Sequence, residues 1–121
     1  MPEQERLDAL SARVHAEKAR ESQVHLQQRT VEALTGLLAR ITNEGLPVIS
    51  WSIHSNPAKE ALTGTCDAGN TDKRRKDFEV WRQAINAERL PDETNAEGAT
   101  RLRAEVTDNY LGLSIALTAD V

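Results

Sequence analysis

A long segment free of proline sets the first constraint on this fold. Residues 3–44 contain no proline and one glycine, Gly36, among many Glu, Gln, Arg, Lys, Ala and Leu residues, which lose little conformational freedom in a helix. Gly45 then stands where a left-handed helix cap is needed, and Pro47 cannot continue a helix. The sequence therefore predicts one long helix that ends near Glu44.

The length of this helix divides the chain. About 40 helical residues would span roughly 60 Å, whereas a compact body of fewer than 100 residues has a radius of gyration of only about 12 Å. We therefore predict a single domain with two parts: residues 1–45, a long helix whose residues 1–28 form an overhanging arm, and residues 46–121, a compact body. A frayed N-terminus is the alternative interpretation of the arm.

Two apolar stripes follow the predicted helix. In its second half, spacings of three and four residues predict a stripe that packs on the body: Val31, Leu34, Leu38 and Ile41. In the arm, Leu7, Leu10 and Val14 form a shorter stripe. Its register continues through Glu17, Glu21 and Gln28 with only Val24 apolar, so a sustained coiled coil is not predicted.

A first hairpin opens the body. Residues 48–54 alternate strictly between apolar and polar side chains, Asn56-Pro57 supplies a turn, and residues 61–66 return. Antiparallel pairing then sets Ile53 opposite Leu62, Trp51 opposite Gly64 and Ile49 opposite Cys66, so a large ring covers the strand glycine. Cys66 is predicted to face the core as a small, inert apolar residue.

A second helix and a second hairpin complete the body. Thr71 or Asp72 caps a helix that is predicted to run to about Glu88, with Phe78, Trp81 and Ile85 on its buried face, and residues 91–98 are predicted to form an acidic loop. Residues 101–107 and 111–117 alternate on either side of an Asp108-Asn109 turn. That two-residue turn pairs Val106 with Leu111, Ala104 with Leu113 and Leu102 with Ile115.

Together these elements define the predicted fold class. It is α+β, with a long N-terminal helix followed by a four-stranded antiparallel sheet and one packed helix, in the order αββαββ.

One face of the predicted sheet carries small side chains where large polar ones are usual. Small residues let another chain approach closely, and an apolar stripe on an isolated helix gains by meeting a second chain. We therefore predict a partner or dimer interface, with a merely solvated sheet face as the alternative. Its residues are Leu7, Leu10, Val14 and Val24 on the helix, and Ser50, Ser52, Thr63, Thr65, Ser114 and Ala116 on the sheet, near Gly112, Thr118, Arg101, Arg103 and Glu105.

Catalytic and metal-binding patterns are missing from the sequence. There is no nucleophile elbow, phosphate-binding loop, dinucleotide fingerprint or His-Glu-x-x-His pattern. His15 and His25 fall on different faces of the helix, and strand parity separates His54 from Cys66. With one cysteine, neither an internal disulfide nor a cysteine-based zinc cluster forms. We expect no catalytic residue, cofactor or metal.

One basic cluster stands out in a chain whose net charge is −4: Lys73, Arg74, Arg75 and Lys76. These cations are possible anion contacts, and they support the alternative function of a small regulator that binds nucleic acid through phosphate. A solvated cluster is the simpler interpretation, and nucleic acid is not the expected partner.

A resemblance rests on core and turn residues of the body. The chain resembles small uncharacterised proteins of high-GC actinobacteria, a resemblance that implies no activity, and its αββαββ order is similar to dimeric folds of the secretion-chaperone kind. The residues that carry the resemblance are Leu46-Pro47, Trp51, Leu62-Thr63-Gly64, Phe78, Trp81, Gly98-Ala99-Thr100, Leu102 and residues 116–121.

The sequence thus predicts a non-enzymatic protein-interaction or adaptor module, homodimeric and cytoplasmic. No apolar run approaches the roughly 20 residues of a membrane span, and the first residues lack the pattern of a signal peptide. A third hypothesis, with less support, is a small-ligand binder or enzyme that uses His54. The partner and the pathway are not predicted.

Overall fold

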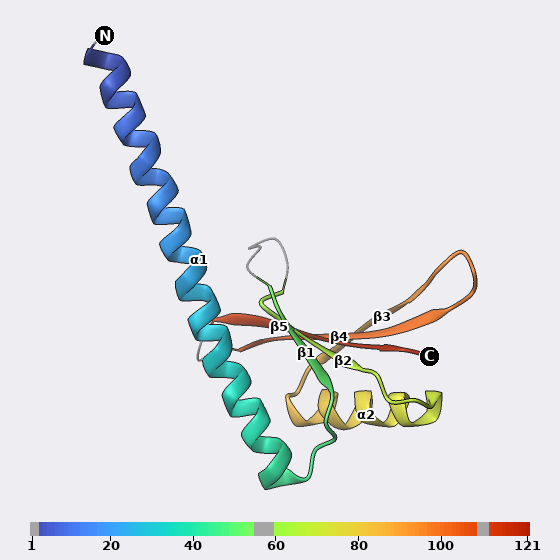
Figure 1. The fold of residues 1–121 in the computed structure, drawn as a ribbon. Helices are drawn as coiled ribbons and strands as arrows, with labels where there is room; N and C mark the ends of the chain where they lie inside the picture. The colour runs from blue at the N-terminus through green and yellow to red at the C-terminus, as the bar shows by residue number, and fades with distance from the viewer. Residues whose placement is uncertain (1–2, 55–59, 109–111) are drawn as a thin grey trace.

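The computed structural model describes residues 3–54, 60–108 and 112–121, without the side chains of residues 3–12, 15 and 108. Two helices and five strands follow one another along the chain: α1 (Glu3–Glu44), β1 (Ser50–Ile53), β2 (Leu62–Cys66), α2 (Thr71–Ala84), β3 (Glu88–Thr94), β4 (Thr100–Asp108) and β5 (Leu113–Asp120). Figure 1 shows α2 against one face of the sheet and the N-terminal half of α1 projecting well beyond the body. The predicted α+β class with a long N-terminal helix is confirmed.

The sheet has five strands in the order β1-β2-β5-β4-β3, and it is mixed. β2 runs parallel to β5, whereas the other neighbours are antiparallel. The prediction of four antiparallel strands is therefore wrong in two respects. It missed β3, and it did not foresee that the first hairpin joins β5 in parallel.

β3 lies where the sequence predicted the end of a helix and an acidic loop. α2 ends early because Asn86 adopts a positive φ of 56°, and the backbone N–H groups of Asn86 and Ala87 donate to the carbonyls of Gln83 and Arg82. That arrangement is a left-handed helix cap, for which asparagine is suited. β3 is an edge strand, so its charged residues and the register shift around Pro91 are compatible with pairing on one side only.

The two hairpins differ in how well the sequence predicted them. The register of β1 and β2 is confirmed, with Ile53 opposite Leu62 and Trp51 opposite Gly64. In the second hairpin Val106 pairs with Ile115, Ala104 with Leu117 and Leu102 with Ala119, so the predicted pairs are wrong by four residues. The connection is longer than two residues, since Asp108 pairs with Leu113; Asn109 lies outside the described residues.

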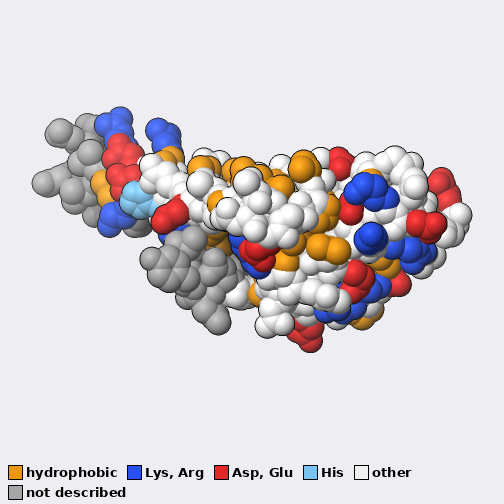
Figure 2. Space-filling view, turned by 90° about the horizontal axis from the view of Figure 1, so that it is seen from below, with side chains coloured by type: hydrophobic (Ala, Val, Ile, Leu, Met, Phe, Trp, Pro, Cys, Tyr) orange, Lys and Arg blue, Asp and Glu red, His pale blue; other side chains and the backbone are white. Residues whose placement is uncertain are grey.

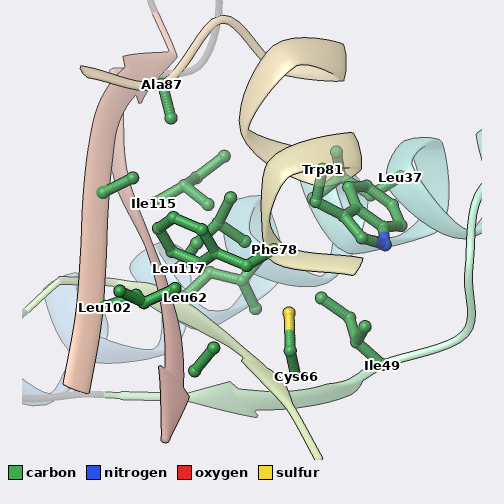
Figure 3. Close-up of a cluster of buried hydrophobic side chains, with 12 residues drawn as sticks. Leu37, Ile49, Leu62, Cys66, Phe78, Trp81, Ala87, Leu102, Ile115 and Leu117 are labelled. Atoms are coloured by element: carbon green, nitrogen blue, oxygen red, sulfur yellow. The ribbon is translucent and has the colours of Figure 1, made fainter. Parts of the chain in front are cut away.

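The core lies between the sheet and α2. In Figure 3, Phe78 points from α2 toward side chains of β2 and β5, Trp81 lies beside Leu37 of α1, and the sulfur of Cys66 points into the same cluster. Phe78, Trp81, Leu62 and Leu117 are fully buried, and Ile85 packs at the margin. The indole N–H of Trp81 donates to the Pro47 carbonyl at 2.7 Å, which ties α2 to the segment that follows α1.

α1 reaches the body through a face that the sequence misplaced. Leu34 and Ile41 pack against the core as predicted, but Val31 and Leu38 are about half exposed. The prediction favoured large apolar residues and overlooked small or polar ones that allow a close approach. The residues that face the body, called the inner face below, are Leu26, Thr30, Ala33, Leu34, Leu37 and Ile41.

Gly64 provides a test of this packing. A Cβ atom there would lie 2.8 Å from Cζ3 of Trp51, 2.9 Å from Cδ1 of Ile49 and 3.0 Å from Cδ2 of Leu117. We expect Gly64→Ala to lower the free energy of unfolding by about 1–3 kcal/mol, because the core is overpacked. Chemical denaturation measures the change.

Gly36 is the matched control, since a Cβ atom there meets nothing within 4 Å. Gly36→Ala is expected to raise stability by about 0.5–1 kcal/mol, because alanine is the better helix former. Equal effects of the two substitutions would contradict the packing described around Gly64.

Candidate functional site: the outer seam of α1 and the open sheet face

The described part of α1 carries apolar side chains on two opposite sides. Val14, Val24, Val31 and Leu38 are 46%, 44%, 50% and 47% exposed. At 100° per residue Val24 lies half a turn from Ala33, whereas Leu38 lies only about 40° from Leu34, so the line of exposed apolar residues runs opposite the inner face at Val24 and beside it at Leu38. We call this line the outer seam; it comprises Val14, Glu17, Glu21, Val24, Gln28, Val31, Thr35 and Leu38.

The spacing in the outer seam alternates between three and four residues, as in helices that pair with another helix. Val24, Val31 and Leu38 repeat every seven residues. The predicted interface residues Val14 and Val24 are both exposed, whereas the side chains of the predicted Leu7 and Leu10 lie outside the described residues. Sequence analysis missed Val31 and Leu38 as surface residues because it assigned them to the core.

Further apolar side chains are exposed near the body end of α1. Val48 is 79% exposed before β1, and Ile53 is 39% exposed at the end of that edge strand. In Figure 2, hydrophobic side chains gather over the middle of the molecule, whereas charged side chains flank them toward both ends. Exposed apolar surface of this kind is typical of an interface.

The sheet face opposite α2 forms the second part of the candidate site. This open sheet face carries all the predicted sheet residues: Ser50 and Ser52 are exposed, and Thr63, Thr65, Ser114 and Ala116 are half-buried. A hollow of about 210 Å³ lies over it, between Thr63, Ala116 and Thr118 on its floor and Arg103 and Glu105 on β4. β3 adds Glu88, Leu90 and Glu93, which sequence analysis had placed in a helix and a loop.

Polar groups of the open sheet face bond to one another. His54 Nε2 lies 3.2 Å from Thr63 Oγ1, Thr118 Oγ1 lies 3.4 Å from Thr65 Oγ1, and the Ser50 hydroxyl bonds the Asp67 carboxylate. No carboxylate bonds the ring of His54 among the described residues, so no charge relay is formed there. Mutual bonding of this kind stabilises a surface without activating a nucleophile.

Two ion pairs border the open sheet face. Arg101 Nε donates to Asp120 Oδ1 at 2.7 Å, and this bond lowers the pKa of the Asp120 carboxyl below its usual value. Arg103 pairs with Glu93 at 3.3 Å. Both arginines are therefore engaged within the chain.

The basic cluster is partly used inside the fold. Lys73 Nζ lies 3.0 Å from the buried carboxylate of Asp77, and Arg74 donates to the carbonyls of Ala68 and Asp120 at 2.7 and 2.6 Å. Asp77 was not singled out from the sequence, although its position four residues after Lys73 on a helix predicts this ion pair. Arg75 and Lys76 are exposed. Of the four predicted anion contacts, these two are therefore the ones least engaged in contacts within the chain. Binding of nucleic acid stays an untested prediction.

The residues that the structure describes bring no cluster of metal-ligating side chains together. Within them, no three His, Cys, Asp or Glu side chains come together as a metal site. An open hollow of about 500 Å³ lies along α1 between Ser22, His25 and Glu32, and it has no nucleophile paired with a base. No helix in that part of the chain combines the length and the apolar character needed to cross a membrane.

Comparison with known protein families, characterised proteins and solved structures finds no match to this chain. The resemblance to actinobacterial proteins therefore stays a prediction, and the arguments about function rest on the surfaces described above.

Cys66 offers a test of the chemistry of the core. It is buried, as predicted, and burial, with the carboxylates of Asp77 and Asp67, raises the pKa of its thiol from 9.0 to about 12. We expect the folded protein to resist alkylation at pH 8 and to react once it is unfolded, because the thiolate is the reactive form. Alkylation followed by mass spectrometry measures this difference.

The same pKa shift predicts how stability depends on pH. Between about pH 9 and pH 12 the unfolded chain releases the thiol proton while the folded chain keeps it. The contribution of Cys66 to stability is therefore full below pH 9 and is lost as pH rises through this window. Cys66→Ala should show a shallower decline, and identical slopes for both proteins would contradict the burial of the thiol.

Proposed function

We propose that this protein is a non-enzymatic interaction module that forms a homodimer through the outer seam of α1. The observation that carries the proposal is the line of Val14, Val24, Val31 and Leu38 along α1, outside the inner face, with each side chain about half exposed. Apolar side chains so arranged gain free energy only when a second surface covers them.

The area of the chain supports a second copy as the occupant. The chain exposes 8121 Å², whereas a compact protein of 13.4 kDa exposes about 6,500 Å². The excess is roughly 1,600 Å², about twice the 800 Å² or so that each partner buries in a standard interface. A dimer through α1 therefore has surface to bury without any rearrangement of the body.

The geometry of α1 also favours pairing between two identical helices. The N-terminal half of α1 projects beyond the body (Figure 1), so its part of the outer seam is open to a second copy. Isologous contact of this kind is the commonest form of oligomer symmetry. The open sheet face of each copy is then left for a further protein partner.

The exposed outer seam and the open sheet face favour interaction as the function. The proposed cytoplasmic location rests on the sequence, which holds a single cysteine.

Val31→Glu tests the proposal. In each copy the substitution places a carboxylate where the dimer buries an apolar group, and we expect dissociation to become at least about 100-fold more favourable. The folded monomer should keep its stability within about 0.5 kcal/mol, because Val31 is exposed within the chain. Sedimentation velocity over a micromolar concentration series measures the mass, and thermal denaturation measures the stability.

Val48→Glu is the matched control, since it makes the same exchange at an exposed valine outside α1. It should leave the dimer intact. A wild-type protein that sediments as a monomer at micromolar concentration, or a dimer unaffected by Val31→Glu, would contradict the proposal.

A further inference from the structure

Resting on the proposed function, we infer that the two copies of α1 pair in antiparallel orientation, so that the arm of each copy covers the body end of the other's outer seam. Charged residues within and beside the seam carry this inference. Glu17 and Glu21 occupy two successive seam positions between Val14 and Val24, and all four side chains are exposed in the single chain.

A parallel pair places identical residues opposite each other. Glu17 would then face Glu17 of the second copy, and Glu21 would face Glu21, which gathers four carboxylates in the contact. Beside the seam, a parallel pair brings Arg13 of one helix next to Lys18 of the other, because flanking residues five apart meet across such a pair. Both contacts are between like charges and oppose association.

An antiparallel pair separates the carboxylates. When Leu38 faces Val14 of the second copy, Val31 faces Glu21 and Thr35 faces Glu17. The nearest carboxylates of the two seams then lie about 15 Å apart along the axis, at about 1.5 Å per residue. This distance exceeds the Debye length of about 8 Å at physiological ionic strength, so their repulsion is largely screened.

The same alignment joins opposite charges beside the seam. In antiparallel pairs, residues on the same flank of the two helices meet. Lys18 of each copy then lies within about 3 Å, along the axis, of the level of Glu32 of the other, and both side chains are exposed in the single chain. The antiparallel dimer thus has two attractive charge pairs where the parallel dimer has two repulsive ones.

Apolar residues meet at both ends of the antiparallel pair. The arm carries Val14 and Val24, while the body end carries Val31 and Leu38. An antiparallel pair brings each arm onto the partner's body end, so Val14 of each copy faces Leu38 of the other.

Cross-linking of full-length protein tests the orientation. Val14→Cys and Leu38→Cys are prepared separately, mixed to exchange subunits, and treated with a short bismaleimide; buried Cys66 gives a low background. We expect a covalent dimer in the mixture and none in either variant alone, because like positions are about 36 Å apart in the antiparallel pair. A covalent dimer in each variant alone would show a parallel pair and overturn the inference.

Charge exchange gives an independent measurement on the same dimer. We expect Lys18→Glu to weaken dimerisation by about tenfold, because in both symmetric contacts the new carboxylate lies next to Glu32 of the other copy. The double variant Lys18→Glu with Glu32→Lys is expected to restore the wild-type affinity. In a parallel pair Lys18→Glu would strengthen the dimer, because the new carboxylate would meet Arg13. That result, or a double variant as weak as the single one, overturns the inference.

Sedimentation of the samples before cross-linking distinguishes failure of the proposed dimer from failure of the proposed orientation. If the protein is a monomer at the concentration used, the proposed function fails and the orientation fails with it. If the protein is a dimer but no sample cross-links, the contact lies elsewhere than the outer seam, and the antiparallel pairing is overturned although the dimer stands.

Discussion

Burial of one side of β5 beneath α2 is the interaction on which the rest of the structure depends. β5 is the only described strand that joins the β1-β2 hairpin to the β3-β4 hairpin, and its Leu113, Ile115, Leu117 and Ala119 are all buried. Phe78 and Trp81 cover this side. Because the central strand holds both hairpins, β1 and β3 can be short or highly charged without loss of the sheet.

α1 links the stability of the body to the surface proposed for association. Its inner face uses small or polar residues, Thr30 and Ala33, where the helix approaches the strands closely, and Leu37 where it reaches Ile49 and the core. Its outer seam uses Val and Leu, which fill space between separate helices. One helix therefore carries both the contact with the body and the surface proposed for association.

Much of the local structure could be predicted from the sequence, because local rules determine it. The end of α1 at Gly45, the pairing of Trp51 with Gly64 and the burial of Cys66 follow from turn chemistry and strand alternation. The four-residue error in the second hairpin left the buried face correct, since an even shift preserves strand parity. β3 was missed because an edge strand with alternating charges lacks the apolar signal of a strand. The outer seam required knowledge of which side of α1 the body covers, and two apolar faces on one helix leave that choice open.

The place of β5 in the sheet governs the order in which the chain can fold. Within its hairpin β2 has one edge unpaired, and its parallel partner is β5, the last strand among the described residues, in which Ile115 pairs with Leu62. During synthesis, therefore, α1, the first hairpin and α2 all emerge before the strand that closes their common core. Contacts between segments so far apart form slowly, and the apolar faces of α1 are exposed meanwhile. In the proposed dimer, early contact between nascent or newly released chains through α1 would shield those faces, so that assembly would accompany folding.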